Sequence, residues 1–112
     1  MPMKLNKDSF DKAKSMIQSG KVVEDSDWSD VQPSTDDENK FLKKNGWDQY
    51  SDWFLALDTE ESDETKGHYN FPYGDFENVH RSAVIAIKQR AGQYDYDDIE
   101  KAADKLLEAI DQ

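Results

Sequence analysis

The chain has 112 residues, which suits a single domain, and its 25 acidic and 14 basic residues give a formal net charge of −11. This charge opposes direct binding to nucleic acid or to an anionic membrane, and no segment approaches the roughly 18 apolar residues of a membrane span. The absence of cysteine excludes disulfides, a thiolate nucleophile and a cysteine-based zinc site. Three Trp, five Tyr and five Phe argue against disorder, because disordered chains are poor in aromatic residues. We therefore expect one compact cytoplasmic domain without a cofactor.

The first third of the chain predicts a helix, a short strand and a loop. Asn6 is expected to cap a helix whose apolar face repeats at helical spacing and which ends at Gly20. Val22 and Val23 follow as a short strand. Residues 24–38 hold seven acids and no base, so we predict an exposed loop there, anchored by Trp28.

The middle of the chain predicts a helix followed by a hairpin. Ser34 and Asp37 have the spacing of a capping box, and Gly46 is expected to end the helix that they open. The apolar run over residues 53–57 predicts a strand, and residues 69–71 are its expected antiparallel partner across a long acidic loop.

Two further helices complete the prediction. An apolar stripe predicts a central helix over residues 76–91, and a last helix is expected to begin at Asp97, with Glu100 in the capping-box position. The predicted fold class is therefore α+β, a single compact domain of about four helices with a short two-stranded antiparallel hairpin. The expected core includes Phe10, Trp53, Leu55, Phe76 and Ile87.

Catalytic chemistry has little support in the sequence. A serine nucleophile needs an adjacent base, and the two histidines are His68, in a predicted loop, and His80, near the start of the predicted central helix. Ser82 is two residues from His80, so the two side chains would point to different sides of that helix. We therefore predict a protein that is not an enzyme.

The acidic segment from Asp25 to Asp30 has oxygen ligands at alternate positions, as the opening of a calcium loop does. However, Asp30 stands where such a loop has its turn glycine, and Pro33 stiffens the ninth position. A solvated acidic loop is the favoured interpretation, so we predict no metal site.

The charge is unevenly distributed. Residues 24–65 carry 14 acids and three bases, a difference equal to the net charge of the whole chain. This acidic middle segment serves solubility in one interpretation, and in another it docks a basic partner or imitates DNA.

Surplus aromatic residues and the two arginines predict contact with a protein partner. A two-layer domain of this size cannot easily bury so many large rings, and exposed Trp or Tyr with Arg is typical of interfaces. We expect no direct contact with nucleic acid and no membrane contact, and the sequence carries no signal for an oligomeric state. The candidate protein-binding residues are Trp28, Trp47, Tyr73, Arg81, Arg90, Tyr94 and Tyr96.

One stretch resembles a known family. Lys-Gly-His-Tyr-Asn-Phe-Pro-Tyr-Gly-Asp-Phe at residues 66–76, followed by Val-His-Arg-Ser-Ala-Val-Ile-Ala-Ile-Lys-Gln-Arg and Asp-Ile-Glu-Lys-Ala-Ala-Asp-Lys-Leu-Leu, is similar to segments found beside tailed-phage prohead proteases. The wider chain resembles small bacterial proteins with the same arrangement. The resemblance covers residues 66–110 and lacks the protease domain, so it implies no activity. It implies a compact, phage-related module in which Tyr69-x-Phe71-Pro72 forms a turn that positions a helical pair.

These features predict a non-catalytic protein-interaction module. The alternative is an acidic DNA mimic or a phage-related regulatory protein.

Overall fold

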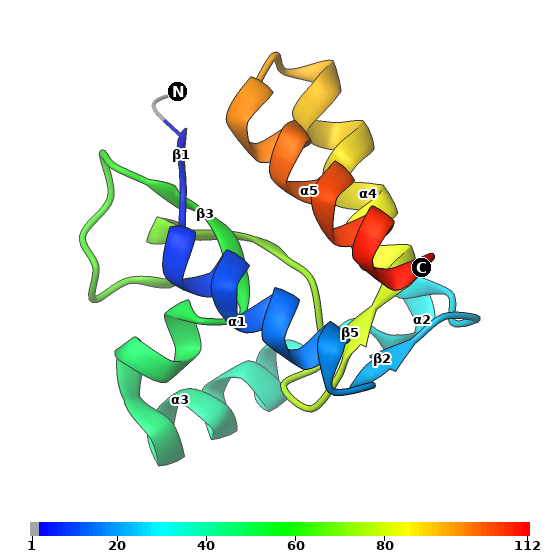
Figure 1. Cartoon of the computed structure of the whole chain (residues 1–112). Helices are drawn as coiled ribbons and strands as arrows, with labels where there is room; N and C mark the ends of the chain where they lie inside the picture. The colour runs from blue at the N-terminus through cyan, green and yellow to red at the C-terminus, as the bar shows by residue number, and fades with distance from the viewer. Residues whose placement is uncertain (1–2) are drawn as a thin grey trace.

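The structure is a computed structural model that describes residues 3–112 (Figure 1). Its strands are β1 (Met3–Leu5), β2 (Val22–Val23), β3 (Phe54–Asp58), β4 (Tyr69–Pro72) and β5 (Val79–His80). Its helices are α1 (Lys7–Gln18), α2 (Trp28–Val31), α3 (Thr35–Ser51), α4 (Arg81–Gln93) and α5 (Asp97–Ile110), with a short 3-10 turn, η1 (Lys66–His68). The predicted α+β class is confirmed.

The main sheet has three antiparallel strands in the order β1–β3–β4. The predicted hairpin is present as β3 and β4, with Ala56 opposite Asn70. The other edge of β3 pairs with β1, which places Leu5 opposite Ala56. The sequence did not predict β1, because three residues are too few to show an alternating pattern.

A second, parallel pair joins β2 to β5, with Val22 opposite Val79 and Val23 opposite His80. The strand predicted at Val22–Val23 is therefore confirmed. The central helix was predicted to begin at Phe76, and this was wrong, because α4 begins at Arg81. Phe76 has a φ of 70°, in the left-handed region that interrupts a helix.

The helix ends show which local signals the fold uses. The capping box of Ser34 and Asp37 is confirmed at the start of α3. The helical turns that Ser34 opens end at Gly46, as predicted, because Gly46 has a φ of 84°. A second run of helical turns follows this kink and continues to Ser51 within α3. Helix α5 begins at Asp97 as predicted, although its N-cap is Tyr96 and makes no side-chain capping bond.

Asn6 stands at the N-cap of α1 but does not use its side chain as a cap. Its amide nitrogen instead donates hydrogen bonds to the carbonyl and hydroxyl oxygens of Ser51 and to the carbonyl oxygen of Phe54, at 3.0–3.1 Å. The predicted capping role of Asn6 was therefore wrong. Asn6 is 6% exposed, and its amide fastens α1 to the turn that leads into β3.

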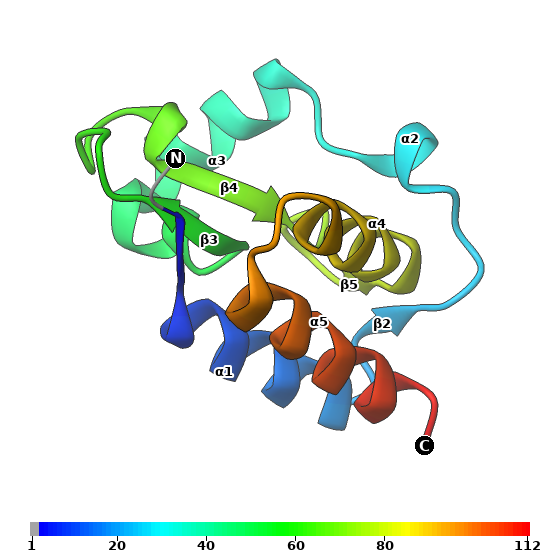
Figure 2. The same cartoon turned by 90° about the horizontal axis from the view of Figure 1, so that it is seen from above.

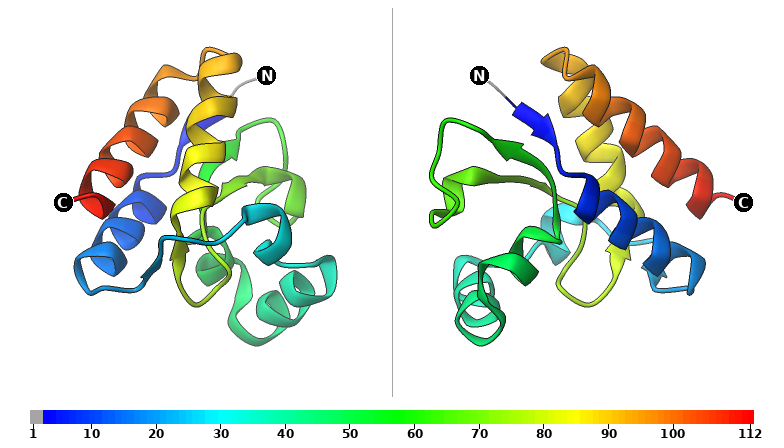
Figure 3. Two further views of the ribbon diagram at one scale, coloured as in Figure 1. Left: turned by 90° about the vertical axis from the view of Figure 1, so that its right-hand side faces the viewer. Right: turned by 60° about the vertical axis from the view of Figure 1, so that its left-hand side comes forward.

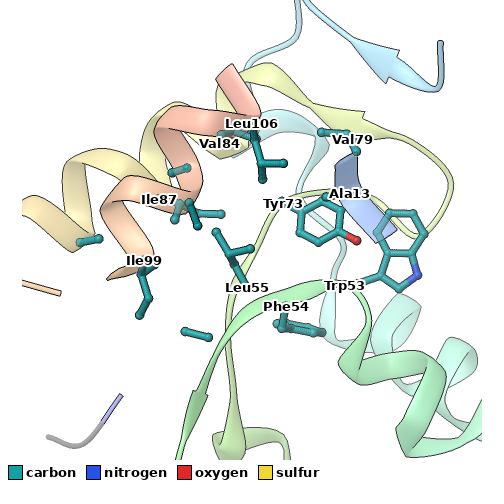
Figure 4. Close-up of a cluster of buried hydrophobic side chains, with 14 of the residues drawn as sticks. Ala13, Trp53, Phe54, Leu55, Tyr73, Val79, Val84, Ile87, Ile99 and Leu106 are labelled. Atoms are coloured by element: carbon teal, nitrogen blue, oxygen red, sulfur yellow. The ribbon is translucent and has the colours of Figure 1, made fainter. Parts of the chain in front are cut away.

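The core lies between the main sheet and the helical pair α4–α5 (Figure 4). Helix α1 lies alongside α5 and closes the same side of the molecule (Figures 2 and 3). Trp53, Leu55 and Ile87 are buried as predicted, whereas Phe10 and Phe76 are partly buried at its margin.

The loop predicted over residues 24–38 contains α2, and α3 already begins within it. Among residues 3–112, no helix combines the length and apolarity that a bilayer span requires.

Gly74 lies where the chain passes directly over the ring of Trp53. A Cβ atom at this position would be 2.6 Å from that ring and would also meet the carbonyl oxygen of Asn78. We therefore expect Gly74→Ala to lower the free energy of unfolding by about 1–3 kcal/mol, because the packed ring has to shift. Urea unfolding measures this, with Gly67→Ala as the control, where the added methyl group makes only an ordinary contact with Glu61. Equal losses in both variants would contradict the prediction.

Candidate functional site

A groove of about 390 Å³ runs between α2, the end of β4 and α4. Helix α4 contributes four residues that lie on one helical face because their spacing is i, i+3, i+4 and i+7: Ala83, Ala86, Ile87 and Arg90. The resulting floor is mostly apolar, with one charged side chain at the rim. This α4 groove is lined by Trp28, Gln32, Asn70, Phe71, Pro72, Ala83, Ala86, Ile87 and Arg90.

Aromatic rings extend the α4 groove toward the C-terminal end of α4. The ring of Phe71 lies 6.2 Å from that of Tyr96, which stacks on Tyr94 at 6.0 Å, measured between centroids. The guanidinium of Arg90 sits 5.9 Å from the centre of the Tyr94 ring, within cation–π range. Tyr94 is 54% exposed, the largest exposed apolar side chain among residues 3–112.

The backbone at the end of β4 limits how a ligand can bind beside it. Phe71 has a φ of 63°, an uncommon conformation for a bulky residue, and Pro72 has no N–H group. Although β4 is an edge strand, these two residues cannot continue a regular ladder with a further strand. This end of β4 therefore offers a ligand side-chain contacts and not further strand pairing.

The two arginines of α4 have different surroundings. Arg81 forms a two-pronged ion pair with Asp111, at 2.9 and 3.1 Å, away from the α4 groove. Arg90 forms no ion pair with any residue in the described part of the chain. In a protein of net charge −11, Arg90 thus presents a cation with no acidic partner at the groove rim.

The structure brings together four of the seven candidate binding residues, Trp28, Arg90, Tyr94 and Tyr96. Arg81 lies elsewhere, and Trp47 is half-buried against Tyr50 and Tyr69. Tyr73 is fully buried, so its placement on the surface was wrong (Figure 4). Its ring stacks on Trp53, and its hydroxyl donates to the carbonyl oxygen of Asp52 at 2.6 Å.

A polar network that the sequence did not reveal lies behind Trp28. His80, 3% exposed, contacts the hydroxyl of Ser26 through Nδ1 at 2.7 Å and the carboxylate of Asp75 through Nε2 at 2.9 Å. The hydroxyl of Ser26 also lies 3.2 Å from that of Ser82. The Trp28 ring lies beside that of His80, with 5.7 Å between the ring centroids and 47° between the ring planes.

Hydrogen bonding fixes the proton positions in this network. A carboxylate only accepts, so in neutral His80 the Nε2 atom carries the proton and Nδ1 accepts from the hydroxyl of Ser26. Burial disfavours the charge of Asp75, but hydrogen bonds from the N–H groups of Asn78 and Glu77 and from His80 outweigh it and lower the pKa of Asp75. Asp75 is therefore charged, and its hydrogen bond holds the His80 ring in place.

His80 and Ser82 were predicted to lie on one helix and therefore to point to different sides. In fact His80 ends β5 and precedes α4, and its serine partner comes from the distant β2–α2 loop. The parallel pairing of β2 and β5 brings Ser26 and His80 together across 54 positions. A pair of two-residue strands has no periodicity that could have predicted this contact.

In the acidic loop, the side chain of Asp27 accepts hydrogen bonds from the N–H and hydroxyl groups of Ser29 and caps α2. Within residues 3–112 the structure gathers no set of three or more His, Asp or Glu side chains suited to a metal ion.

Comparison of the chain with protein-family models, with curated proteins and with solved structures finds no match. The resemblance of residues 66–110 to segments beside prohead proteases thus stays a prediction.

Proposed function

We propose that the protein is an interaction module that binds an extended segment of a partner protein in the α4 groove. The segment carries a carboxylate that pairs with Arg90 and, beside it, an aliphatic or aromatic side chain that packs between Trp28 and Ile87. The observation that carries the proposal is the unpaired guanidinium of Arg90 at the rim of an apolar groove.

Charge complementarity supports an acidic group in the partner. A guanidinium favours planar, two-pronged pairing with a carboxylate, and desolvation beside apolar walls strengthens that contact. Tyr94 holds the guanidinium over its ring face, which reduces the conformational entropy lost on binding. Trp, Tyr and Arg are also the residues most enriched among binding hot spots.

The test is a selection from a random peptide library displayed on phage, with the purified protein as bait. We expect enriched peptides to place Asp or Glu next to a large apolar residue. Measured by fluorescence anisotropy, their affinity for Arg90→Glu is expected to fall about 10-fold or more, since a favourable charge contact becomes repulsive.

Arg81→Glu is the matched control, because it makes the same charge change on the same helix, away from the α4 groove. It is expected to bind the selected peptides as the unmodified protein does. Trp28→Ala is expected to weaken binding, because it removes one wall of the groove. Peptides without acidic enrichment, or equal affinity for Arg90→Glu and the unmodified protein, would overturn the proposal.

A further inference from the structure

We propose that Ser26 is an activated nucleophile that accepts an acyl group from small ester substrates, with His80 as its general base and Asp75 as the residue that positions His80. This inference is independent of the α4 groove. It rests on the hydrogen-bonded chain from Ser26 through His80 to Asp75, which is the arrangement that activates a serine hydroxyl.

The hydroxyl of Ser26 is placed to pass its proton to His80. In neutral His80, the proton on Nε2 is held by Asp75 at 2.9 Å, which leaves the lone pair of Nδ1 directed at the Ser26 hydroxyl 2.7 Å away. Both distances lie within the reach that general-base catalysis requires. The roles of the two ring nitrogens are reversed relative to the usual serine triad, but the direction of proton transfer is the same.

Ser26 is partly accessible and lies beside the start of α4. Ser26 is half-buried, whereas His80 is buried, so of these two residues Ser26 is the more accessible to a small molecule. Ser82 lies in the first turn of α4, a helix of 13 residues whose N-cap side chain makes no capping bond. The hydroxyl of Ser26 therefore adjoins a helix N-terminus, where N–H groups and the helix dipole stabilise a developing oxyanion.

The reaction needs only the ester and water. The Ser26 oxygen forms a bond to the carbonyl carbon of the ester while its proton passes to Nδ1 of His80. The bond from that carbon to the alcohol oxygen then breaks, and His80 returns the proton to the leaving alcohol. The product is an ester on Ser26, which water hydrolyses through the same base to a carboxylic acid.

The test uses a fluorophosphonate probe, which reacts with activated serines. The Ser26 oxygen bonds to phosphorus, fluoride leaves, and the displaced proton passes through His80 to solvent. Intact-mass analysis and peptide mapping are expected to find one adduct, on Ser26. Ser26→Ala is expected to abolish it, whereas the matched control Ser29→Ala, three residues further along the chain in α2, is expected to leave it unchanged.

Asp75→Asn tests the positioning role. Its amide oxygen can still accept from the N–H groups of Glu77 and Asn78, while its NH₂ group donates to Nε2 and moves the ring proton to Nδ1. We expect labelling to slow about 100-fold or more. ¹⁵N NMR of His80 is expected to show the change of tautomer, which a merely structural role would not produce. Labelling of Ser26 no faster than that of Ser29, or unchanged labelling in Asp75→Asn with the tautomer reversed, would overturn the proposal.

Discussion

Asn6→Asp is expected to lower the free energy of unfolding by about 3 kcal/mol at pH 7. The amide nitrogen of Asn6 donates to two carbonyl oxygens and one hydroxyl in a buried site. The substitution keeps the shape but replaces this donor by a carboxylate oxygen, which then faces the oxygens of Ser51 and Phe54. Both the lost hydrogen bonds and the buried charge oppose folding.

The pH dependence distinguishes this mechanism from a simple loss of packing. Burial among oxygens raises the pKa of the new carboxyl group in the folded state, so the folded state binds a proton more readily than the unfolded state. Stability is therefore expected to recover as the pH falls from 7 toward 4. Urea unfolding at several pH values measures this. Asn39→Asp, at an exposed position of α3, makes the same charge change and is expected to cost little; an equal loss there would contradict the mechanism.

Alkaline pH is expected to destabilise the protein through Tyr73. Burial, with a smaller contribution from the charge of Asp52, raises the pKa of Tyr73 above its ordinary value near 10. Above that pH the unfolded chain loses the phenolic proton while the folded state retains it, so ionisation favours unfolding. Each pH unit above about 10 is expected to remove about 1.4 kcal/mol until the folded-state pKa is reached.

Tyr73→Phe isolates this effect. At neutral pH the variant is expected to be about 1 kcal/mol less stable, because the hydrogen bond to the carbonyl of Asp52 is lost. Above pH 10 the stability of the variant is expected to fall less steeply than that of the unmodified protein, because its unfolding releases one proton fewer. The two stabilities are expected to be equal near pH 11. Burial also raises the pKa values of Tyr50 and Tyr69. These two residues account for the decrease of stability with pH that remains in the variant. Parallel stability curves from urea unfolding between pH 8 and 11.5 would contradict the assignment to Tyr73.

Local patterns predicted the parts of the fold that depend on neighbours in the sequence. The last helix was placed correctly because five of its apolar residues recur at helical spacing, and all five are buried: Ile99, Ala102, Ala103, Leu106 and Ile110. The capping box of Ser34 and Asp37 involves residues three positions apart, so it was also readable. The hairpin followed from a five-residue apolar run and its aromatic partner.

Pairings between distant residues could not be predicted in this way. β1 needs β3 as its partner, and β2 needs β5, in each case more than 50 residues further along the chain. The left-handed conformation of Phe76 also has no local signal, and the Phe76 ring packs against Trp53 and Phe41, which are distant in the sequence.

The same distinction applies to the sites. The apolar stripe of α4 was predicted, but periodicity cannot show that Ala83 and Ala86 line a groove while Val84 enters the core. The aromatic residues near the C-terminal end of α4 were singled out by composition. The network around His80 was missed, because Ser26 meets it only through the pairing of β2 with β5.

The packing of α1 against α5 has a consequence for synthesis on the ribosome. The buried face of α1, which includes Ala13 and Ile17, is covered by a helix that begins at Asp97. At translation rates of roughly 5–20 residues per second, α1 waits about 5–20 seconds for that helix to be made. During this interval its apolar face is open to chaperones and to other chains, so the N-terminal third completes its folding only after release of the C-terminal helix.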